Sequence, residues 1–180
     1  WAEAEDEARA LGEEVVVQTD DIIRAEGPER HGRAGWSVSY EIFVPRVTDL
    51  RLETNNGGIG LTSLRGGLDF RTSNGGLSLD GLAGNVRGRT TNGGVDVTLR
   101  GDRWDGESLD VRTTNGGIRL RMPEDYSARL ETGTVNGRTR VDFPITVQGR
   151  IGRELSATLG DGGALVRAQT TNGGVRVSRY

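Results

Sequence analysis

The chain has 180 residues, 29 of them glycine, and its 23 basic residues, all arginine, against 26 acidic residues give a formal net charge of −3. Apolar residues and glycine together lie near the ~45–50% of globular domains, which excludes a disordered chain, and no apolar run approaches the ~20 residues that span a bilayer. The absence of cysteine excludes disulfides, thiol nucleophiles and zinc-thiolate sites.

The first 45 residues are expected to form a cap of mixed local structure. Ala2–Glu14 is rich in helix formers and predicts a short helix. The stretch "VVVQTDDIIRAEG" places two β-prone runs around Asp20 and Asp21, which predicts a hairpin. In "WSVSYEIFVPR", apolar and polar residues alternate from Trp36 to Val44, which predicts a strand with one buried face.

Six asparagines recur through the rest of the chain, most of them in the motif T-x-N-G-G. Their spacings are 18, 18, 23, 21 and 36 residues, which gives a base period of 18, two insertions and one unmarked double turn. A fixed period is the signature of a solenoid, in which equivalent residues of successive coils stack into ladders. The expected ladder residues are Asn56, Asn74, Asn92, Asn115, Asn136 and Asn172, with Thr54, Thr72, Thr90, Thr113, Thr134 and Thr170 two residues before them.

Mostly apolar residues alternate on both sides of each asparagine, four and six residues before it and three and five residues after it. Each repeat therefore predicts two strands joined by a tight corner, at which the glycine pairs supply positive φ angles. Because one coil cannot bury its own apolar face, coils must stack about 4.8 Å apart. The expected fold is all-β, a single-stranded β-helix (β-solenoid) with coils of about 18 residues over 46–180, preceded by the α/β cap over 1–45.

The stretch "VSYEIFVPRVTDLRLETNNGGIGL", the repeated T-x-N-G-G and the closing "GRELSATLGDGGALVRAQTTNGGVRV" resemble a bacterial adhesin-like family of unknown function, over about residues 36–180. The resemblance implies a right-handed β-helix, often on a secreted, lipid-anchored or membrane-tethered protein, and it implies no catalytic residues. Two features depart from the family pattern. Arg138 stands in place of a second glycine, and no Asn-Gly-Gly marks a coil between Asn136 and Asn172.

A calcium β-roll is a competing interpretation of the glycine pairs, because its repeat G-G-x-G-x-D-x-U-x (U, a large apolar residue) places an aspartate in every turn. Only "GGLSLDGLA" fits, through Asp80 and Leu82. Thr62, Arg71 and Thr98 occupy the aspartate position in the other repeats, so the stack of carboxylates that calcium needs is missing. We therefore expect no metal and no other cofactor.

Carbohydrate-active β-helix enzymes use clusters of carboxylates and basic residues on one face, and such an enzyme is the alternative function. The outward position five residues before each asparagine contains Arg51, Asp69, Arg87, Asp110, Glu131 and Arg167. Opposite charges on neighbouring coils are typical of a solvated ion-pair ladder. Because His31 is the only histidine, no Ser-His or metal-histidine site can be assembled, and we expect no catalytic residue.

The outward face after the asparagines becomes basic toward the C-terminus. Guanidinium groups suit phosphate and carboxylate, so this face is a candidate contact for an anionic polymer, although arginines that merely solvate the face are the plainer interpretation. A tryptophan in the polar insertion "GDRWDGES" either stacks on a ligand or, as we favour, folds back over the coil. The candidate interaction surface comprises Arg119, Arg121, Arg138, Arg140, Arg176 and Trp104.

These features together predict a non-catalytic structural or adhesive module of a bacterial cell-envelope protein, located outside the cytoplasm. Its expected partner is an anionic surface polymer or an envelope protein, the latter allowing a role as an envelope-stress scaffold, and we expect no nucleic acid. The chain ends in "VRVSRY", so the final coil is expected to have an open edge. That edge would either pair with another copy or be blunted by Arg176 and Arg179.

Overall fold

The computed structural model describes residues 13, 15–19, 22–27, 36–144 and 153–180. The chain divides into two units, residues 1–43 and 44–180. In the first unit, β1 (Val16–Thr19) and β2 (Ile23–Glu26) pair antiparallel, which confirms the predicted hairpin. The predicted helix Ala2–Glu14 falls almost entirely outside the described residues, as does His31.

The strand predicted from Trp36 to Val44 does not form. Residues 36–45 belong to no strand, and Phe43 is 89% exposed while Tyr40 and Ile42 are about half exposed. The alternating sequence supplies the side-chain pattern of a half-buried strand, but a strand also needs a neighbour for its backbone hydrogen bonds. No described strand pairs with this segment.

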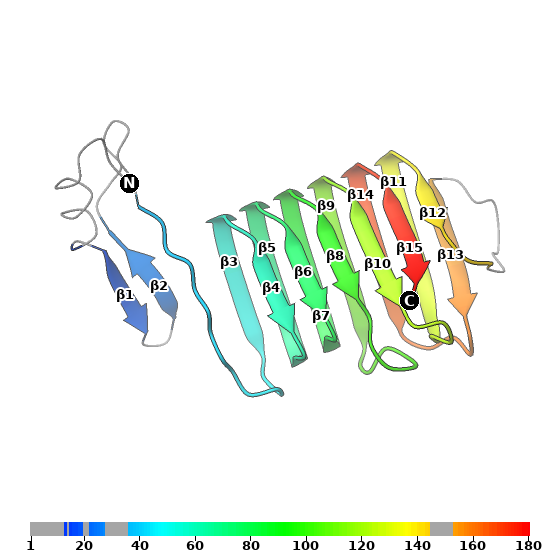
Figure 1. Ribbon diagram of the computed structural model, residues 1–180, viewed down its shortest axis with the longest axis horizontal. Coiled ribbons are helices and arrows are strands. Elements are labelled where there is room, and N and C mark those ends of the chain that lie inside the picture. The colour runs from blue at the N-terminus through cyan, green and yellow to red at the C-terminus, as the bar shows by residue number, and fades with distance from the viewer. Residues whose placement is uncertain (1–12, 14, 20–21, 28–35, 145–152) are drawn as a thin grey trace. The chain divides into compact units, whose positions relative to one another are not determined.

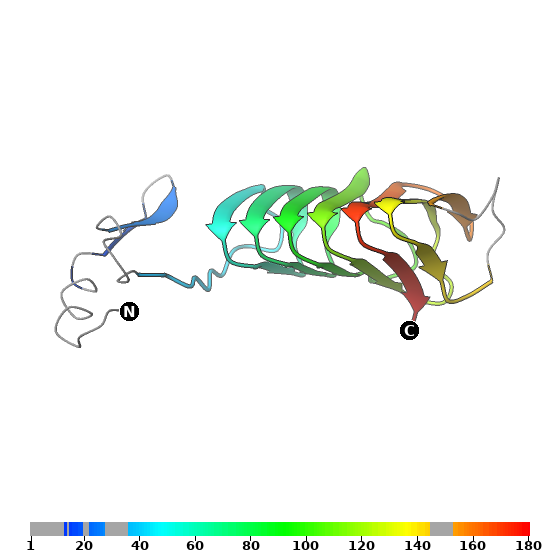
Figure 2. The ribbon, with the colours of Figure 1, turned by 90° about the horizontal axis from the view of Figure 1, so that it is seen from above.

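The second unit consists of two facing β-sheets, and each coil contributes one strand to each sheet (Figures 1 and 2). The seven-stranded sheet contains β3 (Leu50–Asn56), β5 (Arg65–Asn74), β7 (Ala83–Asn92), β9 (Ser108–Asn115), β11 (Ala128–Asn136), β13 (Glu154–Leu159) and β14 (Leu165–Asn172). The six-stranded sheet contains β4 (Ile59–Thr62), β6 (Leu77–Asp80), β8 (Val95–Thr98), β10 (Ile118–Met122), β12 (Thr139–Val141) and β15 (Val175–Arg179). We call each level of the stack a rung.

Two polar ladders join the rungs at the corner that follows each asparagine. The six asparagine side chains form one continuous chain of amide hydrogen bonds of 2.7–2.9 Å. Five of the six threonines donate a hydroxyl hydrogen bond of 2.7–2.9 Å to the carbonyl of a corner glycine on the neighbouring rung, as Thr113 does to Gly93. The T-x-N motif therefore fixes the register of the stack.

The order of the rungs differs from the order of the sequence. Strands β14 and β15, the last coil of the chain, lie between β9/β10 and β11/β12 and pair in parallel with both neighbours. In Figure 1 this coil is red and is flanked by green and yellow strands. The expected open edge at the final coil is therefore wrong, because the backbone of that coil is paired on both sides, and the reason for expecting self-association there is lost.

In the described residues between Asn136 and Asn172, 137–144 and 153–171, the expected unmarked coil is not found. Instead, β13 runs antiparallel to β11 at the end of the seven-stranded sheet, and the chain then turns back through a glycine-rich segment to build the inserted coil. Gly160, Gly162 and Gly163 all have positive φ in that segment, which a reversal of this kind requires.

The corner glycines are required mainly for close packing between rungs, and positive φ is found at only two of the first glycines. Gly75, Gly93 and Gly116 are not among the positive-φ residues, yet a Cβ on any of them would lie 2.0–2.1 Å from a carbonyl oxygen of the preceding rung. A Cβ on the second glycine of a pair would instead approach the following rung, at 3.1–3.5 Å. Arg138 can replace a second glycine because β12 is the last strand of its sheet.

The core lies between the sheets and is filled by the inward columns predicted from the sequence. Two positions in the column four residues before the asparagines depart from the apolar pattern, Gly88 and Thr132. Gly88 leaves room for the buried ring of Phe70 on the adjacent rung, whose Cε2 would lie 2.3 Å from a Cβ at position 88. Thr132 is 3% exposed, and its hydroxyl has no hydrogen-bond partner among the described residues.

Candidate functional site

The candidate site lies on the outer face of the six-stranded sheet, in the column four residues after each asparagine. Across the sheet from β4 to β12, this column contains Gly60, Ser78, Asp96, Arg119, Arg176 and Arg140. Because neighbouring strands lie about 4.8 Å apart, three arginines occupy consecutive rungs at this spacing. The inserted final coil supplies the central member, Arg176.

A row of glycines forms the floor of a shallow hollow beside these arginines. The hollow has a volume of about 370 Å³. We call it the glycine trough; its floor is Gly94, Gly117 and Gly174, its wall is Arg119, Arg176 and Arg140, and Arg138 lines its end on the outermost rung. Because the floor has no side chains, an extended ligand can approach the backbone closely.

Positive charge exceeds negative charge in the glycine trough. Arg119 pairs with Asp96 at 3.3 Å, and Arg176 pairs with Asp142 at 2.6 Å. The side chains of Arg138 and Arg140 pair with no described residue. Exposed ion pairs such as the first two contribute only about 0–1 kcal/mol, so an anionic ligand can displace their carboxylates at small cost.

The remaining two predicted surface residues do not line the trough. Arg121 lies two residues beyond Arg119 on β10, where its charge adds to the hydrogen-bonded Arg100 in lowering the pKa of Asp80. Trp104 is 5% exposed, and its indole N–H donates a hydrogen bond of 3.0 Å to the carbonyl of Gly84. The tryptophan thus folds back into the core and is not available at the surface.

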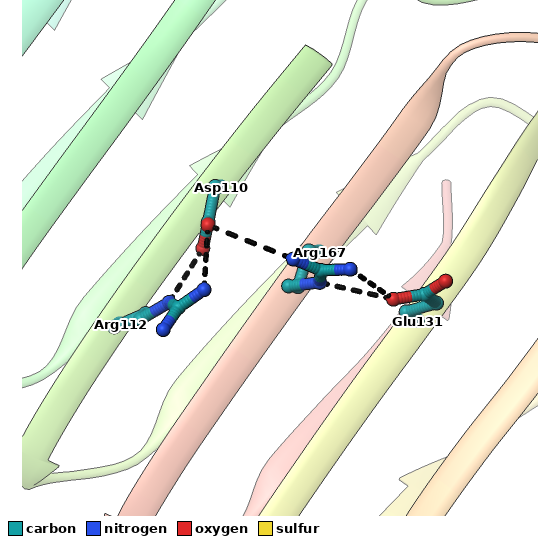
Figure 3. A network of polar contacts seen from close by, with 4 residues as sticks. All are labelled: Asp110, Arg112, Glu131 and Arg167. Carbon is teal, nitrogen blue, oxygen red and sulfur yellow. Dashed lines mark hydrogen bonds and ion pairs between the residues drawn. The ribbon is translucent and has the colours of Figure 1, made fainter.

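The outward column five residues before the asparagines, on the seven-stranded sheet, has a different charge pattern. In spatial order it contains Arg51, Asp69, Arg87, Asp110, Arg167 and Glu131, so the sign changes at every step. Figure 3 shows the best-connected part: Arg167 bonds to Glu131 at 2.6 Å and lies 3.9 Å from Asp110, which also binds Arg112. The charges of this column therefore alternate throughout, and its last three members, Asp110, Arg167 and Glu131, are joined by ion pairs.

In the described part of the chain, no three His, Cys, Asp or Glu side chains gather closely enough to hold a metal ion. Among the same residues, none lies in a helix of the length and apolar character that a membrane span requires.

The sequence interpretation missed a second basic column, three residues before the asparagines on the seven-stranded sheet. Arg71, Arg89 and Arg112 stand on three consecutive rungs there. The signal was present in the repeats, because aligning the chain on its asparagines places all three at the same position.

Comparison with known proteins identifies the fold family. No curated protein and no solved structure matches the chain. One family model matches residues 46–178, which include every strand of both facing sheets except the last residue of β15. The chain belongs to the family that this model describes, Toastrack DUF4097.

Proposed function

We propose that the solenoid is a non-catalytic binding module of a bacterial cell-envelope protein that acts outside the cytoplasm and holds an anionic surface polymer in the glycine trough. The observation that carries this proposal is the run of Arg119, Arg176 and Arg140 on consecutive rungs above an open floor. Like charges on adjacent strands are destabilising, and the aspartates that pair with Arg119 and Arg176 leave Arg140 without a carboxylate partner among the described residues, so an anionic ligand would stabilise this column further.

The alternating column on the opposite sheet supports this interpretation. There the same fold places opposite charges next to one another on all six rungs. Simple solvation of a face therefore does not require like charges to be stacked. Arginine also suits the role chemically, because its planar guanidinium forms paired hydrogen bonds with carboxylate or phosphate.

Binding in the trough can be tested by NMR with a defined probe, a short oligogalacturonate. We expect the backbone amides of Gly94, Gly117 and Gly174 to shift on titration, because the ligand lies over them. The variant Arg138→Gln/Arg140→Gln removes the two unpaired guanidiniums. Charge-assisted hydrogen bonds contribute about 1.5–3 kcal/mol each, so this variant should bind the trough more than tenfold more weakly.

A matched control is Arg51→Gln/Arg87→Gln, which removes the same charge from the alternating column. It should leave the shifts of the trough amides unchanged. If the three glycine amides do not respond to the oligomer in the wild-type protein, the proposed function is wrong. The proposed location, which is secreted, periplasmic or cell-surface anchored, predicts that protease degrades the protein when the outer envelope is permeabilised and the plasma membrane stays intact, whereas full protection under these conditions would contradict it.

We also infer that the coil is right-handed and that residues 1–45 cap its first rung. The handedness follows the general rule that a connection between parallel strands of one sheet is right-handed in about 98% of cases. An experimental structure of the full chain tests both points directly.

A further inference from the structure

We propose that the outer face of the seven-stranded sheet carries a second polyanion-binding groove, so that the solenoid bridges two polymer chains. This inference extends the proposed function and takes its polymer class from it, but it rests on different residues. We call the site the threonine groove. It is lined on one side by Arg71, Arg89 and Arg112 and on the other by Thr91, Thr114 and Thr171, and has a volume of about 670 Å³.

The arginines of this groove form a run of like charges that the protein itself does not neutralise. The Arg71, Arg89 and Arg112 positions are in register on β5, β7 and β9. Only Arg112 has a carboxylate partner, Asp110, at 2.8 Å, and no described residue forms an ion pair with Arg71 or Arg89. As in the trough, stacked like charges on neighbouring strands are unfavourable without a ligand.

The opposite wall offers unused hydroxyl groups. In the ladder position one residue earlier, threonines such as Thr113 are buried and donate to glycine carbonyls. By contrast, Thr91, Thr114 and Thr171 face outward, and their hydroxyls have no partner among the described residues. A hydroxyl both donates and accepts hydrogen bonds, so this wall matches the hydroxyl groups of a sugar or polyol.

The shape of the groove favours one extended chain that runs along the stack. The lined region continues past Arg112 over Gln169 to Gly133, so it covers five rungs, or about 19 Å at the usual strand spacing. Carboxylates mark its two ends, since Glu53 is the register partner of Arg71 and Glu154 lines the far end. The anionic groups of the ligand therefore belong over the arginines at the first three rungs.

The ligand class is a linear polymer with hydroxyl groups and an anionic group on its repeating unit. Trough and groove lie on the outer faces of different sheets, on either side of the asparagine ladder. One straight chain running along the stack cannot fill both. The module therefore has two sites and can link two chains.

Stoichiometry distinguishes the two sites. By isothermal titration with a short oligogalacturonate, the wild-type protein should bind two oligomers. Arg71→Gln/Arg89→Gln, which leaves the Arg112–Asp110 pair intact, should bind one, as should Arg138→Gln/Arg140→Gln, and the combined variant should bind none. The control Arg51→Gln/Arg87→Gln removes the same charge from the same sheet and should still bind two.

Long polygalacturonate provides the test of bridging. Light scattering should rise steeply with the wild-type protein and with the control, but not with either binding-site variant. A glycerol phosphate polymer in parallel titrations shows whether phosphate serves as well as carboxylate; binding of either polymer at two sites supports the proposal.

The hydroxyl wall has its own test. Thr91→Val, Thr114→Val and Thr171→Val together keep the charge and shape of the groove but remove three hydroxyls, which should weaken oligogalacturonate binding in the groove about tenfold. Polyglutamate has no hydroxyl groups, so its affinity should be unchanged by these substitutions. If polyglutamate binds the wild-type groove as tightly as the sugar polymer does, the site recognises acidic peptides and the assigned ligand class is wrong.

The two proposals fail in different ways. If Arg71→Gln/Arg89→Gln still binds two oligomers, the threonine groove is not a site, and the trough is unaffected. If the trough variant still binds two while the groove variant binds one, the function proposed for the trough fails and the groove remains. A wild-type protein that binds neither polymer overturns both.

Discussion

Two buried threonines of the solenoid should respond oppositely to the same substitution. Thr113 is 4% exposed, and its hydroxyl donates a hydrogen bond of 2.8 Å to the carbonyl of Gly93 on the neighbouring rung. Thr132 is 3% exposed, but its hydroxyl has no hydrogen-bond partner in the part of the chain that the structure describes. Valine has nearly the shape of threonine, so Thr→Val at each position changes the hydroxyl and little else.

The magnitudes follow from hydrogen bonding. Thr113→Val removes a hydrogen bond and deprives the Gly93 carbonyl of its donor, which should lower the free energy of unfolding by about 1–3 kcal/mol. Thr132→Val removes a buried hydroxyl that is desolvated without compensation, so it should raise the free energy of unfolding by about 1 kcal/mol. Thr114 is exposed, and its hydroxyl bonds to none of the described residues, so the free energy of unfolding of Thr114→Val should stay within about 0.5 kcal/mol of the wild-type value.

Urea denaturation followed by tryptophan fluorescence measures these differences, because Trp104 is buried in the core and becomes exposed on unfolding. The slopes of the transitions should be equal among the variants, so that midpoints report stability. If Thr113→Val and Thr132→Val shift the midpoint in the same direction, hydrogen bonding does not explain the threonine ladder.

Three further changes probe packing, protonation and topology. Gly88→Ala should destabilise the protein by about 1–3 kcal/mol in urea denaturation, because the new Cβ would lie 2.3 Å from the ring of Phe70. Adding the second substitution Phe70→Leu should recover part of the lost stability. If it recovers none, a clash with Phe70 is not the cause. Burial, with smaller contributions from Asp102 and Tyr180, raises the pKa of Tyr126. Because the folded state holds this proton more tightly than the unfolded state, the free energy of unfolding should fall as pH rises above about 10. Tyr126→Phe should remove this part of the pH dependence, and an unchanged pH profile would refute the assignment. Deleting residues 163–180 removes the rung between β10 and β12. The β-sheet signal in circular dichroism should therefore fall by far more than the share of the deleted residues, because the rungs on either side lose their partner. A fall in proportion to the deleted residues would show that the remaining rungs do not depend on this one.

Most of the coil was predictable because its strands, faces and corners each depend on residues close together in the sequence. The alternation of apolar residues predicts both inward columns, and the shared Thr and Asn positions predict the ladders that hold the register. The segment from Trp36 to Val44 has the same alternation but no strand, since pairing depends on a neighbour that the pattern does not specify. A periodic pattern therefore defines faces more securely than it defines pairing.

The order of the rungs was missed because every coil has the same hydrogen-bonding edge and nearly the same corner. Any coil can stack on any other as far as backbone and ladder residues are concerned. One signal does distinguish the neighbours. In sequence order, Asp110 would lie beside Glu131, which places like charges together, whereas the inserted coil puts Arg167 between them, 2.6 Å from Glu131. Outward charge was thus the best available guide to topology.

The glycine trough was predictable in part, from its arginines, while its floor was not. Sequence reasoning treated the second glycine of each pair as a requirement of the corner, and the structure shows that the same glycines leave an open strip on the outer face. The favoured interpretation of Trp104, that it folds back over the coil, is confirmed because its side chain packs in the core, but its hydrogen bond to the carbonyl of Gly84, 20 residues earlier in the sequence, was not predicted. Contacts between rungs of this kind depend on the stacking order and register, which the motif alone does not give.

The charge distribution supports the proposal that the two basic columns bind an anionic ligand. A solenoid repeats each position at a spacing of about 4.8 Å. If every rung has the same charge at a position, like charges lie next to one another on adjacent strands, which is unfavourable. On the seven-stranded sheet the outward column five residues before the asparagines alternates throughout, which shows that this chain can satisfy the requirement. The two columns that break it, around Arg89 and Arg176, each border a hollow, one floored by glycine and the other walled by unused hydroxyls. We propose that an anionic ligand relieves this repulsion. The stabilisation of the protein by such a ligand should therefore fall most when arginines of these two columns are replaced.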